Sequence, residues 1–189
     1  MILEKEKIFN IPNILSLVRI FLIPCFIISY FSEQYVTSAA ILLASGFTDV
    51  LDGFIARRFN LITNVGKILD PAADKLTQVA IWISLSIKFN NVPGMIIITA
   101  LFFLKELLML IGGIRILKIH KPIASSKWFG KIGTFIFYCV TIYIIAVTDI
   151  ISSNLVFLLV LAVAAYMLFV FIMYIPVYLN IKRSDVENK

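Results

Sequence analysis

Four aspartates are the residues of this chain whose type and spacing suit chemistry. Asp49 and Asp52 are three positions apart, and Asp70 and Asp74 are four positions apart. On a helix, each of these spacings places the two carboxylates on one face. All four lie inside or at the ends of apolar stretches, and an Asp at the centre of a membrane helix costs about 2.5–3.5 kcal/mol. These carboxylates therefore need a compensating partner, which is a wet cavity, a basic side chain or a metal ion.

Divalent metal ions are the partner that the pattern favours. A short loop joins the two stretches that carry the pairs, so we expect antiparallel neighbouring helices and four converging carboxylates. Lys75 is the basic residue expected beside them, and on a helix it points about 100° away from Asp74. Oxygen ligands without His or Cys favour Mg²⁺, Mn²⁺ or Ca²⁺ over zinc. The alternative is that the aspartates are helix caps or interfacial charges.

Small and basic residues border the two pairs. Gly53, Ala56 and Gly66 leave room for a ligand between the helices, or allow the helices to pack closely. Arg57 and Lys67 are placed to bind phosphate oxygens. This combination of carboxylates, divalent ions and basic residues beside lipid predicts phosphoryl transfer on a lipid-bearing diphosphate. In such a reaction, two metal ions can hold the attacking and the leaving oxygen.

The elements that carry these residues are predicted to be membrane helices. Of the 189 residues, 61% are hydrophobic, and the mean hydropathy is +1.00. Soluble domains carry roughly 45–50% apolar residues, and a chain this short cannot bury the excess in one water-soluble core. We therefore predict an all-α integral membrane protein.

Six transmembrane helices are predicted, because a span needs about 20 mostly apolar residues. They cover residues 13–31, 35–56, 71–88, 92–117, 128–148 and 154–179. Residues 4–12 mix charged and apolar side chains and predict a short amphipathic helix at the membrane interface. The chain is accordingly divided into an interfacial helix (1–12), a six-helix membrane domain (13–181) and a cytoplasmic tail (182–189).

Basic residues predict the orientation in the membrane. The formal net charge is +6, and basic residues mark cytoplasmic loops. With six spans, one side holds both termini and the second and fourth loops, whereas the other side holds Lys88. We therefore expect a multi-pass plasma-membrane protein with both termini and the aspartates on the cytoplasmic side. The basic residues of that side are Lys5, Lys7, Arg57, Arg58, Lys67, Lys118, Lys121, Lys127, Lys131, Lys182, Arg183 and Lys189.

The aspartates belong to a longer pattern, which resembles the complete motif of the CDP-alcohol phosphotransferase family. The pattern is Asp49-x-x-Asp52-Gly53-x-x-Ala56-Arg57, eight residues, then Gly66-x-x-x-Asp70-x-x-x-Asp74. The resemblance implies a homodimer with two Mg²⁺ or Mn²⁺ ions in each site. It implies that Asp49, Asp52 and Asp70 are metal ligands, that Asp74 is the general base and a further ligand, and that Gly53, Ala56 and Arg57 contact the CDP moiety.

The resemblance also implies a reaction in phospholipid synthesis. A phosphatidyl group would pass from CDP-diacylglycerol to an alcohol, with release of CMP. Asn10-Ile11-Pro12-Asn13 followed by Arg19, together with Leu69-Asp70-Pro71-Ala72-Ala73-Asp74-Lys75, resembles the phosphatidylglycerophosphate synthase and cardiolipin synthase branches. The acceptor is therefore expected to be glycerol-3-phosphate, with phosphatidylglycerol as the alternative.

The acceptor site is less clearly marked. Glycerol-phosphate enzymes of the family have basic residues at two positions that are Gly113 and Gly133 here. Lys105, Arg115 and Lys131 are the predicted substitutes. The side chains of Lys105 and Glu106 should diverge by about 100° on a helix, so each is expected to need a partner on another helix, either in an ion pair or at the acceptor site.

Two questions stay open at this level. Arg19 is expected to meet either Glu106 or a substrate phosphate. A small transporter with intramembrane carboxylates is a remote alternative function. A transporter places its acids near the midplane, whereas these aspartates are predicted near the cytoplasmic ends of their helices.

Overall fold

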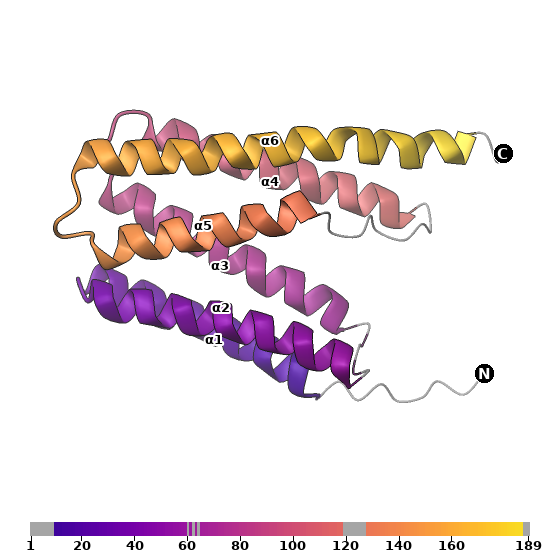
Figure 1. Ribbon diagram of the computed structural model, residues 1–189, viewed down its shortest axis with the longest axis horizontal. Coiled ribbons are helices and arrows are strands. Elements are labelled where there is room, and N and C mark those ends of the chain that lie inside the picture. The colour runs from indigo at the N-terminus through magenta and orange to yellow at the C-terminus, as the bar shows by residue number, and fades with distance from the viewer. Residues whose placement is uncertain (1–9, 60, 62, 64, 119–127, 187–189) are drawn as a thin grey trace. The chain divides into compact units, whose positions relative to one another are not determined.

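The computed structural model describes residues 10–59, 61, 63, 65–118 and 128–186, and in these residues all regular structure is helical. Figure 1 shows the helices in chain order, from indigo to yellow. They are α1 (Ile11–Phe31), α2 (Tyr35–Arg58), α3 (Gly66–Lys88), α4 (Met95–Lys118), α5 (Trp128–Ala146) and α6 (Ser153–Val186). The six predicted helices are thus present, and the prediction of an all-α protein is confirmed.

The helix ends differ from the predicted ones where a polar side chain caps the backbone. The Asn10 side chain accepts a hydrogen bond from the Asn13 N–H at 3.0 Å, so α1 begins at Ile11 and includes part of the predicted interfacial segment. Residues 1–9 of that segment lie outside the described residues. The Thr63 hydroxyl accepts from the Gly66 N–H at 3.0 Å, and α3 therefore begins five residues before Pro71. α6 continues beyond the predicted boundary at residue 181.

Several helices have the length and composition of membrane spans. Within the described residues, Ile11–Phe31, Tyr35–Ala56 and Ser153–Met173 are long and apolar enough to cross a membrane, and Gly130–Ala146 is a shorter apolar helix. Large apolar side chains such as Phe21, Phe47 and Ile172 face outward. These features are those of a membrane-integral α-helical protein. The number of spans, six, stays a prediction.

The first of two compact units comprises Met1–Lys88 and Thr141–Ile150. Its core holds large side chains such as Phe26, Tyr30 and Trp82, each about 1% exposed. Among the described residues, α1 forms close pairs with α2 and with α3, whereas α2 and α3 are not a close pair. α1 is therefore the helix that packs closely against both α2 and α3.

The second unit comprises Phe89–Val140 and Ile151–Lys189, and in it α4 packs against α6. Phe102 and Phe137 stack with ring centroids 6.4 Å apart. Gly133 of α5 lies against α6, where an added Cβ would be 3.1 Å from the Tyr166 ring and 3.4 Å from Val170. A side chain at position 133 would require Tyr166 to move by a few tenths of an ångström.

Candidate active site

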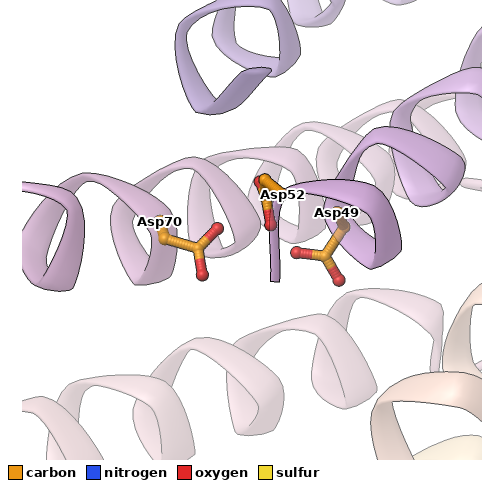
Figure 2. A group of neighbouring side chains, drawn as sticks. All are labelled: Asp49, Asp52 and Asp70. Carbon is orange, nitrogen blue, oxygen red and sulfur yellow. The ribbon is translucent and has the colours of Figure 1, made fainter. Parts of the chain in front are cut away.

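Three of the four predicted aspartates converge in the first unit. Asp49 and Asp52 lie on α2, and Asp70 lies on α3. One carboxylate oxygen from each lies within 4.8 Å of the others, an arrangement that could hold a metal ion (Figure 2). Asp52 is 3% exposed, whereas the side chains of Asp49 and Asp70 are 44% and 45% exposed. The group is therefore anchored in the protein at one side and open at the other.

Arg19 of α1 is the cation at the centre of this group. Its side chain is 1% exposed, and its guanidinium contacts Asp49 at 2.8 Å, Asp52 at 2.5 Å and Asp70 at 3.2 Å. The sequence left Glu106 and a substrate phosphate as partners of Arg19 and indicated Lys75 as the basic residue beside the aspartates, so it did not predict this contact. A contact of Arg19 with a substrate phosphate stays a prediction. Arg19 ends the N-terminal pattern, and a charged residue inside an apolar helix generally pairs with an opposite charge or with backbone carbonyls or faces a wet cavity.

Helix α1 determines how the carboxylates meet. Because α1 packs against both α2 and α3, one side chain on α1 reaches carboxylates on two other helices. The spacing of Asp49 and Asp52 alone predicts which face of α2 they share. It does not predict that a third helix joins them to Asp70.

Asp74 lies one turn after Asp70 and outside the group of three. It is close enough to Asp49 and Arg19 to interact with both electrostatically. The buried amide of Gln78 donates to the Asp74 carboxylate at 3.1 Å, and Lys75 donates in turn to Gln78 at 3.4 Å. Gln78 is a site residue that sequence reasoning missed, although its spacing of four from Asp74 was a usable signal.

A cavity of about 200 Å³ lies beside the carboxylates. Its wall includes the predicted small residues and two of the aspartates. They are Gly53, Ala56, Gly66, Asp52 and Asp70, joined by Asn13, Ser16 and Thr63 from α1 and the α2–α3 loop. The small residues therefore leave room for a ligand, which was one of the two roles that the sequence suggested for them beside close helix packing.

Two asparagines tie the α2–α3 loop to the start of α1. The Asn10 amide donates to the Leu61 carbonyl at 2.9 Å, and the Asn13 amide donates to the Thr63 hydroxyl at 3.2 Å. A Cβ at Gly66 would lie 2.6 Å from Asn13 Oδ1. A side chain at Gly66 would therefore displace the Asn13 amide, which lines one wall of the cavity.

The predicted basic residues of the substrate sites are described only in part. The side chains of Arg57, Lys67 and Arg115 lie outside the described residues. Lys131, in the second unit, is exposed.

Lys105 and Glu106 form an ion pair with each other in α4, although their side chains were expected to diverge. Lys105 is 6% exposed, and its ammonium lies 5.2 Å from the Phe102 ring centroid. Burial brings the two charges together because neither is solvated there.

Comparisons with known proteins agree with the motif. A family model described as CDP-alcohol phosphatidyltransferase matches residues 9–172. The chain is 35% identical over 125 residues to a CDP-diacylglycerol–glycerol-3-phosphate 3-phosphatidyltransferase of Aquifex aeolicus, covering 66% of this chain and 69% of the relative. An enzyme of the same name from Bacillus subtilis is 32% identical over 170 residues, covering 80% and 81%.

A further relative is an enzyme with a different name. A cardiolipin synthase (CMP-forming) / mitochondrial hydrolase fusion protein of Schizosaccharomyces pombe is 37% identical over 84 residues. The match covers 44% of this chain and 14% of that protein.

Proposed function

The chain belongs to the CDP-alcohol phosphatidyltransferase family, and we propose that it transfers a phosphatidyl group from CDP-diacylglycerol to glycerol-3-phosphate, with release of CMP. The observation that carries this proposal is the group of three carboxylates within 4.8 Å beside a cavity lined by the small residues of the motif. The names of the Aquifex and Bacillus relatives support the two substrates.

The carboxylates fit divalent metal ions by the chemistry of their donor atoms. Asp49, Asp52 and Asp70 would hold them, with Asp74 as the further ligand that the motif implies. Hard oxygen donors suit Mg²⁺ or Mn²⁺. Bound there, such ions would supply positive charge to balance the phosphates and the departing CMP.

The nucleotide half of the substrate is proposed to occupy the cavity. Gly53, Ala56 and Gly66 leave the space, and Arg57 and Lys67 would bind phosphate oxygens. The diacylglycerol chains would then lie along the apolar outer surface of the helices, which is where lipid belongs.

Asp74 is proposed to be the general base. It would take the proton of the acceptor hydroxyl, whose oxygen attacks the phosphorus atom that carries diacylglycerol. The bond from this phosphorus to the oxygen of CMP then breaks. Gln78 would hold the Asp74 carboxylate in place through the hydrogen bond at 3.1 Å.

The acceptor site is proposed to include Lys105, Arg115 and Lys131. Phosphatidylglycerol is the second candidate acceptor, and one observation favours it. Gly133 stands where a basic residue is expected, and a Cβ at this position would lie 3.1 Å from the Tyr166 ring, a tight contact. The name of the Schizosaccharomyces pombe relative agrees with that alternative.

The active site is proposed to face the cytoplasm of a six-span plasma-membrane protein, and the protein to act as a homodimer. The asymmetric distribution of basic residues supports the orientation. The dimer rests on the family resemblance.

Product analysis tests the proposed function. Purified protein would be incubated with CDP-diacylglycerol, Mg²⁺ and either glycerol-3-phosphate or phosphatidylglycerol, and the product identified by mass spectrometry. Phosphatidylglycerophosphate is the expected product, and excess chelator should abolish its formation. Cardiolipin as the sole product would overturn the choice of acceptor, and turnover in excess chelator would overturn the role of metal.

A further inference from the structure

Arg19 lies where divalent ions are proposed to bind. Its guanidinium touches one oxygen of each carboxylate, namely Asp49 Oδ1, Asp52 Oδ2 and Asp70 Oδ1, at 2.8, 2.5 and 3.2 Å. The side chain is 1% exposed. A buried cation inside a group of metal-binding carboxylates is not needed to explain phosphatidyl transfer, so it calls for its own account.

The guanidinium is held mainly by the carboxylates themselves. Its Nε atom is buried and has no hydrogen-bond partner among the described residues. The two terminal nitrogens make the contacts to Asp49, Asp52 and Asp70. The position of the charged end of Arg19 therefore depends on these carboxylates rather than on a separate binding site in the fold.

The charges explain what Arg19 does in the absence of metal. Three carboxylates within 4.8 Å repel one another strongly when they are ionised. Arg19 neutralises one of these charges and is hydrogen-bonded to all three groups. A divalent ion would be attracted to the same oxygens and would be repelled by the guanidinium a few ångströms away.

We propose that Arg19 is the internal counter-ion of the metal-free site, holding the three carboxylates together and competing with divalent ions for them. This inference rests on the proposed metal dependence. It predicts that Arg19 stabilises the metal-free protein and weakens metal binding. An arginine that only filled space would stabilise both states equally.

Manganese binding and thermal unfolding test this inference together. Metal-stripped protein in nanodiscs would be titrated with Mn²⁺, with free Mn²⁺ measured by electron paramagnetic resonance. We expect Arg19→Gln to bind Mn²⁺ roughly tenfold more tightly, or better. Its Tm in chelator should fall by about 5–10 °C, and saturating Mn²⁺ should restore most of this loss.

Two further variants test whether the positive charge of Arg19 causes the change in affinity for Mn²⁺. Arg19→Lys keeps the charge, so its affinity for Mn²⁺ should stay within about threefold of wild type. Lys88→Gln removes the ion pair that Lys88 makes with Glu33 at 3.2 Å, far along α3 from the carboxylates, and should leave the affinity for Mn²⁺ unchanged.

Unchanged or weaker Mn²⁺ binding by Arg19→Gln would overturn the inference, as would an equal loss of Tm with and without Mn²⁺. If Arg19→Gln alone does not fold, the double variant Arg19→Gln/Asp49→Asn removes one charge of each sign. Its Tm in chelator should lie within a few degrees of wild type, and failure to fold would also count against the inference. No Mn²⁺ binding by the wild-type protein would instead refute the proposed metal site.

Discussion

At the scale of single residues, the site depends on a few charged groups whose neighbours decide their roles. Asp49, Asp52 and Asp70 contact one cation, Arg19. Asp74 is also near enough to Arg19 to interact with it electrostatically, and it accepts a hydrogen bond from Gln78. The contact with Gln78 allows the proposed role of Asp74 to be tested separately.

Loss of a ligand carboxylate should reduce the reaction rate strongly. We expect Asp49→Asn or Asp70→Asn to lower the rate of CMP release at least roughly 100-fold, in the range found for losing one electrostatic contact to a transition state. Asp149→Asn is the matched control, because Asp149 is exposed and lies in the turn after α5. Turnover of Asp70→Asn close to wild type would contradict the metal assignment.

Variants at Asp74 and Gln78 should lose catalytic rate but still bind the substrate. Asp74→Asn removes the proposed base, so transfer should cease while CDP-diacylglycerol still binds. Gln78→Leu leaves the carboxylate but removes its hydrogen bond, and kcat should fall about tenfold with KM nearly unchanged. Single-turnover kinetics and equilibrium binding of CDP-diacylglycerol check both variants. A raised KM with an unchanged kcat in Gln78→Leu would show that Gln78 does not position the base.

At the scale of helices, α1 is the element that assembles the site. It packs against α2 and α3, supplies Arg19 to the carboxylates and fixes the α2–α3 loop through Asn10 and Asn13. The cavity wall is formed where these three elements meet. A change at this junction should therefore alter substrate binding without touching a charged group.

Gly66→Ala tests the junction. The new Cβ would lie 2.6 Å from Asn13 Oδ1, so Asn13 must move and its contact with Thr63 should weaken. We expect a several-fold rise in the KM for CDP-diacylglycerol. Gly46→Ala is the matched control, because a Cβ at Gly46 of α2 meets nothing within 4 Å and Ala favours a helix by roughly 0.5–1 kcal/mol. Equal KM values for the two variants would contradict the proposed role of Gly66.

At the scale of the whole molecule, the outward apolar side chains and the long apolar helices indicate residence in a membrane. The described helices agree with the six predicted segments in number and order. The proposed orientation places the α2–α3 loop in the cytoplasm and the α1–α2 and α5–α6 turns outside.

Cysteine labelling in intact cells tests the orientation. Cys25 and Cys139 are exposed and would first be replaced by Ser. Cysteines at Ser32 and Ser153 should then react with a membrane-impermeant maleimide from outside, whereas one at Phe59 should react only after permeabilisation. Labelling of position 59 from outside would refute a cytoplasmic active site.

The sequence by itself determined the helical class, the order of the helices and the three aspartates, Asp49, Asp52 and Asp70, that the structure brings together. Hydropathy and a spacing of three or four residues are local properties of the sequence. Together with the period of the α-helix, they predict which side chains lie on the same face of a helix. The small residues that line the cavity were identified for the same reason, since Gly53, Ala56 and Gly66 lie one turn or less from an aspartate.

Only the tertiary structure decided which charges meet. Arg19 is 30 residues or more from each of its partners in the chain, and no local period relates it to them. The packing of α1 against both α2 and α3 brings them together. The buried pair of Lys105 and Glu106 was misjudged for a related reason: flexible side chains in a low-dielectric environment reach the nearest opposite charge, even where the helix period separates their Cβ atoms.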